Sequence, residues 1–196
     1  MEITIFKDIK DTEQPFYRDV AIILDRIKDG SSKELVKSIR SEKDKSKRND
    51  LKQKLPAICF SGKFTKRNDS SLAQHSGLIC LDFDGYENDK LMLEEKEKLT
   101  KDRYVYSAFI SPSGLGLKVL VKIPAEEETH KSFFNSLQQH FGSPYFDETC
   151  KNVSRVCYES YDPLIYINEQ SSVFNQITEE KYQVNTKHKD VQTIPI

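Results

Sequence analysis

The segment Gly77-Leu-Ile-Cys-Leu-Asp-Phe-Asp84 places the strongest constraint on how this chain can fold. In it, an apolar run ends in two aspartates one residue apart. Alternate side chains of a β-strand share a face, so Asp82 and Asp84 project side by side. Neighbouring carboxylates repel one another unless a positive charge lies close by. Mg²⁺ is commonly held by one or two carboxylates together with substrate phosphates. The pattern therefore predicts a metal site on a strand; the alternative is a strand that ends in a polar turn at Gly85.

The composition narrows the class of protein. A chain of 196 residues with 31% charged residues fits one domain, and its net charge of -1 gives no overall attraction to nucleic acid. Residues 43–54 are nevertheless strongly basic, and a local basic patch can bind phosphates. The four cysteines form no C-x-x-C pair, so we expect no structural zinc. No apolar run approaches the ~20 residues that cross a membrane, and no signal peptide is recognisable. We expect a cytoplasmic, soluble protein without a membrane partner.

The order of elements predicts an α+β fold. From residue 78 to about 160 the pattern reads strand, helix, strand, strand, helix, strand, over 78–83, 88–101, 103–110, 117–123, 126–141 and 155–159. This βαββαβ order is that of an RRM-like or ferredoxin-like palm core. We expect an N-terminal α/β subdomain over 1–76 packed on a core over 77–170, with a polar tail or linker over 171–196. A helix over 14–28 and a short strand over 164–167 complete the prediction.

The alternation within two strands predicts which face of the sheet carries the site. Three residues of the first strand form an apolar face that should pack on the helices: Ile79, Leu81 and Phe83. Asp82, Asp84, Lys118 and Lys122 then share the opposite face, which we expect to be open. An open face with acids and lysines suits metal and phosphate; for Lys122 the preferred interpretation is a lysine that is merely solvated.

The hairpin Ser111-Pro-Ser-Gly-Leu-Gly-Leu-Lys118 is a second candidate feature. Gly114 and Gly116 let the backbone approach a ligand closely, while Ser111 and Ser113 offer hydroxyls and Lys118 offers a charge for phosphate. A strand follows the loop, so it is no Walker A motif, and an ordinary glycine-containing hairpin is the alternative. In an ideal sheet we expect this hairpin at the opposite end from Asp84, so either the sheet is bulged there or Lys118 is not in the site.

Asp147 is the third carboxylate. It precedes the last predicted core strand, which should start near the end of the first strand and so bring Asp147 to Asp82 and Asp84. Three carboxylates can hold two metals for in-line attack on a phosphoryl group. Arg155 could bind a phosphate through two hydrogen bonds. The alternative is that Asp147 caps a turn over 148–151.

Together these motifs resemble the archaeo-eukaryotic primase superfamily. Its pattern is an apolar strand ending in D-x-D or D-x-E, a small-residue strand ending in His, and an apolar-Asp pair with a downstream Arg. The chain resembles most the primase-like N-terminal domain of virulence-associated-E-type replication proteins of phages and mobile elements, over residues 3–168. Further matching segments are Leu55-Pro-Ala-Ile-Cys-Phe-Ser-Gly-Lys-Phe64, His75-Ser-Gly77 and Ser154-Arg-Val-Cys-Tyr-Glu-Ser-Tyr-Asp-Pro163. The chain departs from the pattern at Lys118, where many primases have His.

The resemblance implies a DNA primase or polymerase that joins nucleotides on a single-stranded DNA template. Asp82, Asp84 and Asp147 would bind Mg²⁺ or Mn²⁺, with one metal activating a 3′-hydroxyl and the other holding the triphosphate. The groups expected to bind the nucleoside triphosphate are Ser111, Ser113, Gly114, Gly116, Lys118 and Arg155. Lys63, Lys66 and Arg67 would follow template phosphates, or form an ordinary solvated loop. A replicative helicase, in cis or in trans, is a further expected partner.

Other functions stay open at this stage. Leu81-Asp-Phe-Asp-Gly85 also resembles the nucleophile strand of haloacid-dehalogenase-type phosphatases, although no Asp-Asp pair occurs in the chain. A non-catalytic module that binds single-stranded nucleic acid would stack bases on aromatic side chains of the sheet. The predicted open face offers acidic side chains instead, which argues against this function. A metal-dependent nuclease could use the same carboxylates. His75 could face the site, but a structural histidine is the preferred interpretation.

Overall fold

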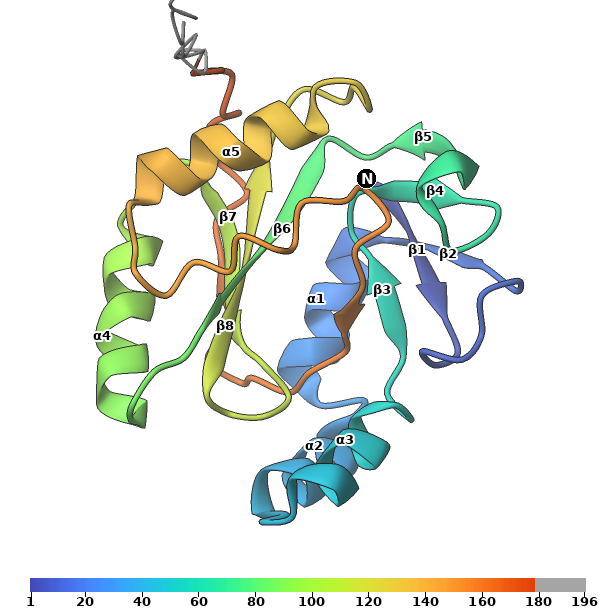
Figure 1. Ribbon diagram of the computed structural model, residues 1–196, viewed down its shortest axis with the longest axis vertical. Helices are drawn as coiled ribbons and strands as arrows, with labels where there is room; N and C mark the ends of the chain where they lie inside the picture. The colour runs from blue at the N-terminus through green and yellow to red at the C-terminus, as the bar shows by residue number, and fades with distance from the viewer. Residues whose placement is uncertain (179–196) are drawn as a thin grey trace, which may run out of the picture.

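The computed structural model describes residues 1–178, and it shows two four-stranded antiparallel sheets with helices packed around them (Figure 1). The N-terminal sheet has the order β2-β1-β3-β9 and the central sheet the order β10-β7-β8-β6. The strands of the N-terminal sheet are β1 (Glu2–Phe6), β2 (Phe16–Asp19), β3 (Ala57–Cys59) and β9 (Cys157–Tyr158). Those of the central sheet are β6 (Leu78–Asp84), β7 (Val105–Ile110), β8 (Gly116–Lys122) and β10 (Tyr166–Ile167). A separate ribbon pairs β4 (Gly62–Phe64) with β5 (Leu72–His75).

Five α-helices and one 3₁₀ turn at Asp69–Ser71 connect these strands. They are α1 (Val20–Asp29), α2 (Lys33–Ser41), α3 (Lys45–Lys52), α4 (Asp89–Thr100) and α5 (His130–Phe141). The helix expected over 14–28 begins only at Val20, because β2 occupies Phe16–Asp19 and the Asp19 side chain accepts a hydrogen bond from the Ala21 N–H. Gly30, at φ 92°, ends α1 in the left-handed region. None of the helices in residues 1–178 has the length and apolar character needed to cross a membrane.

The central sheet confirms the α+β class and most of the predicted order. The register pairs β8 antiparallel with both β6 and β7, so β6 and β7 run parallel to each other through α4. The turn between β7 and β8 therefore lies at the same end of the sheet as Asp84, which is directly opposite Gly116. The expectation that this hairpin lies at the other end was wrong, because a crossover helix returns the chain to the end from which β6 started.

The last strand of the predicted core lies elsewhere. Cys157–Tyr158 pairs with β3 in the N-terminal sheet, so the assignment of residues 155–159 to the central sheet was wrong. Beside β6, the segment after α5 takes that place through a single bridge between Phe83 and Phe146. At the far edge β10 pairs with β7, within the short strand predicted over 164–167. The proposed segments 1–76 and 77–170 thus share the N-terminal sheet.

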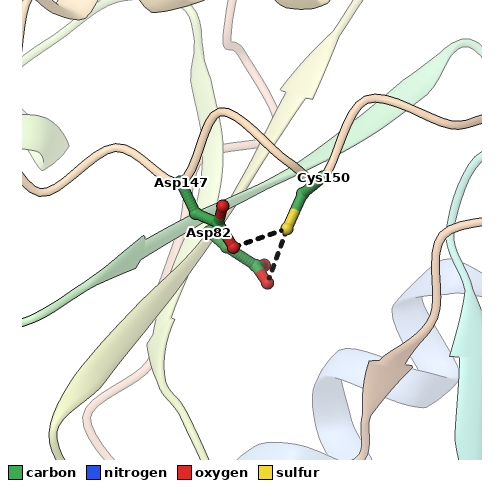
Figure 2. A group of neighbouring side chains, drawn as sticks. All are labelled: Asp82, Asp147 and Cys150. Carbon is green, nitrogen blue, oxygen red and sulfur yellow. Dashed lines mark hydrogen bonds between the residues drawn. The ribbon is translucent and has the colours of Figure 1, made fainter.

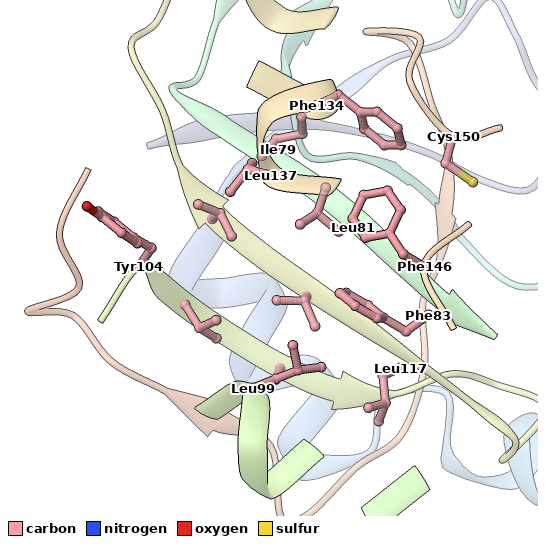
Figure 3. Packing of buried hydrophobic residues seen from close by; sticks show 14 of the residues in the cluster. Ile79, Leu81, Phe83, Leu99, Tyr104, Leu117, Phe134, Leu137, Phe146 and Cys150 are labelled. Atoms are coloured by element: carbon pink, nitrogen blue, oxygen red, sulfur yellow. The ribbon is translucent and has the colours of Figure 1, made fainter. Parts of the chain in front are cut away.

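The helix-facing side of the central sheet follows the predicted alternation. Ile79, Leu81 and Phe83 are at most 1% exposed and pack with residues of α4 and α5 such as Leu99 and Phe134 (Figure 3). Burial of this apolar area is the main force that fixes β6 in the sheet. The end of β6 and its two aspartates are thereby held in place.

The opposite face is not open, contrary to expectation. Cys80 and Leu120 on this face pack against Ile23 and Ile27 of α1. The sequence pattern of β6 does not reveal this cover, because α1 lies far away in the chain. Only the end of β6 that carries Asp84 reaches an exposed position.

The beginning of the expected tail packs on the domain. Phe174 is 2% exposed and its ring lies 5.1 Å from that of Tyr104. Lys122 donates to the carbonyl oxygens of Glu169 at 2.7 Å and Ser171 at 3.3 Å, so it anchors this segment. Residues 179–196 of the expected tail lie outside the described residues.

Candidate metal and phosphate site

A backbone pairing places Asp147 beside Asp82. The segment after α5 crosses β6 (Figure 1), where the Asp147 N–H donates to the Asp82 carbonyl at 2.9 Å. Two residues along, the Asp84 N–H donates to the Tyr145 carbonyl at 2.8 Å. Backbone hydrogen bonds on both sides of Phe83 thus fix the two aspartates relative to each other, and the expected approach of Asp147 to Asp82 is present.

Cys150 completes a compact group with these two carboxylates (Figure 2). Its thiol donates to Asp147 Oδ2 at 2.9 Å and lies 3.4 Å from Asp82 Oδ2. Burial, reinforced by both carboxylates, raises the pKa of Cys150 well above its ordinary value, so the sulfur is a neutral donor. Sequence reasoning missed this residue, since a lone cysteine three positions after Asp147 carries no signal of its own.

Two cations balance the buried charge of Asp82, which is only 4% exposed. Lys118 is its partner in the strand register, and Lys118 Nζ lies 2.5 Å from Asp82 Oδ2. Burial alone would lower the pKa of Lys118, but the attraction of Asp82 outweighs it and the net shift is upward. Arg155 Nη2 lies 3.7 Å from the same oxygen. Lys118 therefore lies directly beside the carboxylate of Asp82 in the site.

Asp84 is not part of this compact group; it lies at the exposed end of β6 and requires a glycine opposite. A Cβ atom on Gly116 would lie 2.1 Å from Asp84 Oδ1, so any side chain there would displace the carboxylate. Partial desolvation by the surrounding groups, together with the negative charges of Asp82 and Asp147, raises the pKa of Asp84 above its ordinary value. Gly116 thus leaves space for the Asp84 carboxylate, and a nearby cation would stabilise the charged form of that carboxylate.

The carboxylate of Asp147 is oriented by its own turn. Asp147 Oδ1 accepts from the Thr149 N–H at 2.9 Å and from the Thr149 hydroxyl at 2.7 Å. Burial raises the pKa of Asp147, but the hydrogen bonds from Cys150 and Thr149 outweigh it, and the net shift is downward. The capping role foreseen as an alternative is therefore present, and it leaves Oδ2 directed at the group with Asp82 and Cys150.

Several polar groups of the hairpin over residues 111–118 form hydrogen bonds with one another. The hydroxyls of Ser111 and Ser113 lie 3.0 Å apart, and the Gly114 N–H donates to the Ser111 carbonyl at 3.0 Å. Arg40 of α2 donates to the same carbonyl at 3.2 Å. Of the groups expected to bind a nucleotide, the Gly114 amide is thus already engaged, whereas Ser113 lines a pocket of about 430 Å³.

The three residues expected to contact template phosphates, Lys63, Lys66 and Arg67, differ in whether they already have an acidic partner. Lys63 and Lys66 form ion pairs of 2.8 Å with Glu2 and Glu13 respectively. Arg67 instead lines a pocket of about 360 Å³ together with Arg155. The structure brings only Arg67 of these three toward Arg155.

His75 lies apart from the carboxylates in a buried pair. Its Nε2 lies 3.0 Å from His130 Nδ1, and its Nδ1 accepts from the Gly77 N–H at 3.0 Å. Both ring nitrogens of His75 have partners, as expected of a structural histidine.

The group fits a hard divalent cation. Ligand atoms of Asp82, Asp147 and Cys150 lie within 4.8 Å of one another, and they come from two segments that the backbone holds together. Carboxylate oxygens are the ligands that Mg²⁺ and Mn²⁺ prefer, whereas a protonated thiol is a poor ligand. Asp82 and Asp147 would thus hold the ion, whereas Asp84, expected as a third ligand, lies outside the residues whose ligand atoms cluster within 4.8 Å.

The fold and site define an α+β protein whose central sheet carries a cluster of carboxylate side chains, with a lysine and an arginine side chain beside it. A family model for the BT4734-like, N-terminal domain matches residues 50–167, more than half of the chain. The chain belongs to this family. No curated protein matches it. Among solved structures, the AEP domain of the cyanophage S-2L primase-polymerase (PrimPol) is similar at 13% identity, covering 89% of this chain and 83% of that chain with a TM-score of 0.45.

Proposed function

We propose that this domain is a metal-dependent nucleotidyltransferase of the primase-polymerase type, acting on a single-stranded DNA template. The observation that carries the proposal is the convergence of Asp82 and Asp147, from separate segments, beside Lys118 and Arg155. Paired carboxylates with adjacent cations suit an ion and the phosphates that accompany it. The D-x-D strand, the glycine hairpin and the downstream Asp and Arg resemble the primase superfamily in the same order.

The carboxylates would hold Mg²⁺ or Mn²⁺, which when bound lowers the pKa of an attacking 3′-hydroxyl and neutralises a departing pyrophosphate. Asp82 would be a buried ligand and Asp147 a half-buried one, and Asp84 would approach the ion from the exposed end of β6. Lys118 balances Asp82 before the ion arrives and is close enough to meet a phosphate afterwards.

Arg155 and Arg67 supply the place for the triphosphate. Both line the pocket of about 360 Å³, together with Asn152, Ser154 and Tyr158. The Nε atoms of both arginines are buried without a hydrogen-bond partner among the described residues. Unpaired buried donors are costly, so an anion that accepts from them would be stabilised. Ser113 and Lys118 would contact the nucleotide from the hairpin side.

A replicative helicase, attached or separate, would present the template. Such a partner follows from the resemblance to virulence-associated-E-type replication proteins, where the primase-like domain precedes a helicase.

The test is synthesis by the purified domain on labelled primer–template and on unprimed single-stranded DNA, with nucleotides and Mg²⁺ or Mn²⁺. We expect metal-dependent products from the wild type and none from Asp82→Ala/Asp84→Ala, with circular dichroism confirming that the variant is folded. Shortening of the label without nucleotides would identify a nuclease instead. Strand binding without synthesis under any metal would identify a non-catalytic module.

A further inference from the structure

Helix α3 and its flanks carry a concentration of positive charge that the fold leaves unpaired. Residues 43–54 contain two acids and six basic residues, namely Lys43, Lys45, Lys47, Arg48, Lys52 and Lys54. None of the six has an ion-pair partner within residues 1–178, and α3 has no buried residue. By contrast Lys63 and Lys66 each have an acidic partner at 2.8 Å. Local charge of this kind attracts phosphates even when the net charge of the chain is near zero.

Three of these cations lie on one face of α3. Lys45, Arg48 and Lys52 are spaced i, i+3 and i+7, which places them on the same side of a helix. Lys47 lies well away from this stripe, at ~200° from Lys45 when each residue turns the helix by ~100°. We call the three residues the α3 basic face.

The α3 basic face adjoins the candidate site. Arg48 lines the pocket of about 430 Å³ together with Ser113 and Gly114 of the hairpin. Lys52 lies within electrostatic reach of Asp84 and Lys118. Since the helix rises ~1.5 Å per residue, Lys45 lies about 10 Å further along the axis than Lys52. The α3 basic face therefore extends along the helix from Lys52, the residue within electrostatic reach of Asp84, to Lys45.

Packing holds this helix in a fixed position. A small apolar cluster of α2 and the following segment, formed by Val36, Ile39 and Leu55, receives Leu51 of α3. Arg40 of α2 donates to the carbonyls of Ser111 at 3.2 Å and Tyr161 at 2.8 Å. The helix pair is thereby tied to the hairpin, so the α3 basic face keeps its position relative to Asp84.

We propose that the α3 basic face binds the phosphate backbone of the single-stranded nucleic acid and guides it to the carboxylates. This inference rests on the proposed function, which explains why the domain would bind a single strand. It adds the surface that the strand contacts. The residues Lys45, Arg48 and Lys52 carry the contact, and the paired cations Lys63 and Lys66 do not.

The test is fluorescence anisotropy of a labelled single-stranded oligonucleotide, titrated at several salt concentrations without nucleotides. The variant Lys45→Gln/Arg48→Gln/Lys52→Gln is compared with Lys43→Gln/Lys47→Gln/Lys54→Gln, which removes the same charge from the same segment. Single-strand contacts contribute a slope of about 0.7 each in log K against log salt, so we expect the first variant to lose about 2 in slope and roughly tenfold or more in affinity. The second variant should stay within about threefold of the wild type.

Equal losses in both variants, or a loss in neither, would overturn the inference. So would a raised nucleotide KM with unchanged strand affinity, because the face would then serve the triphosphate. A wild type that does not bind the strand at low salt would overturn it as well. DNA synthesis tests the proposed function separately. Strand binding through the α3 basic face without any synthesis would contradict the proposed enzymatic function but not the proposed binding surface. Synthesis together with equal strand binding by both variants would contradict the binding surface alone.

Discussion

Lys118 faces Asp82 across the β6–β8 pairing, with 2.5 Å between Lys118 Nζ and Asp82 Oδ2. Both side chains are almost inaccessible, at 12% and 6% exposure. A buried ion pair of this kind contributes little net stability, but removal of one partner leaves an uncompensated charge. The ammonium and a divalent cation would also compete for the same carboxylate.

Lys118→Met should therefore lower the free energy of unfolding by about 3 kcal/mol without metal, because Asp82 loses its nearest cation. Added Mn²⁺ should recover more stability in this variant than in the wild type, since an ion that binds only the folded state stabilises it. Denaturant unfolding with and without MnCl₂ measures both effects. The control Asp82→Asn/Lys118→Met should be less destabilised than Lys118→Met, and equal stability of Lys118→Met and wild type would refute the pairing.

Gly116→Ala should impair the site through Asp84 and leave the fold intact. The added Cβ would lie 2.1 Å from Asp84 Oδ1, which is the end of an exposed side chain and can move away. We expect at least a tenfold loss of primer extension with little change in thermal unfolding. In an Asp84→Ala background the same change should have no further effect on extension, as a double-mutant cycle would show. An additional loss there would assign Gly116 a role independent of Asp84.

Part of the site follows from sequence reasoning, because Asp82 and Asp84 lie on one strand. The alternation in β6 places Ile79, Leu81 and Phe83 against the helices and Asp82 on the other face, and the structure agrees. What the pattern does not reveal is the cover over that face, since α1 packs there through contacts distant in sequence. Periodicity describes one element at a time, whereas burial of its second face is decided by tertiary packing.

The errors at the last core strand, at Cys150 and at the start of α1 have separate causes. Cys157–Tyr158 is too short to show a period, and its pairing with β3 connects residues about a hundred positions apart. Cys150 was missed because only its contacts with Asp82 and Asp147 distinguish it. The start of α1, by contrast, was readable from Asp19 as an N-cap, but the helical spacing of Phe16 extended the predicted helix too far.

Cys150 should resist alkylation in the folded protein. Its raised pKa keeps the thiol protonated at pH 8, and the thiolate is the reactive form. Cys59, Cys80 and Cys157 are buried too, so none should react readily with iodoacetamide before unfolding. Mass spectrometry after a timed exposure, native and in denaturant, measures the difference. Modification of native Cys150 at the rate of a free cysteine would contradict the hydrogen bonds to the carboxylates.

The His75–His130 pair should make the fold sensitive to mild acid. Burial lowers the pKa of His130 to about 4, below the value near 6.5 of an unfolded chain. The unfolded state then binds more protons as the pH falls below 6.5, so stability is lost from there down toward pH 4. For His130 alone the loss between pH 7.5 and 5 is about 2 kcal/mol.

Denaturant unfolding of wild type and His130→Gln at pH 7.5, 6 and 5 checks this expectation. The variant should be less stable at pH 7.5 but lose less between pH 7.5 and 5, because glutamine does not titrate. The same pH slope in both proteins would show that acid acts through other groups.

Asp147 is the most direct test of the whole account, because only the fold brings it to Asp82. The measurement is the rate of primer extension with Mn²⁺ for wild type, Asp82→Asn, Asp147→Asn and the control Asp25→Asn, which changes an exposed aspartate of α1. We predict a loss of about a hundredfold or more for each of the first two variants, consistent with removal of a metal ligand, and a near wild-type rate for the control. Extension by Asp147→Asn at the wild-type rate would contradict a shared metal site at Asp82 and Asp147.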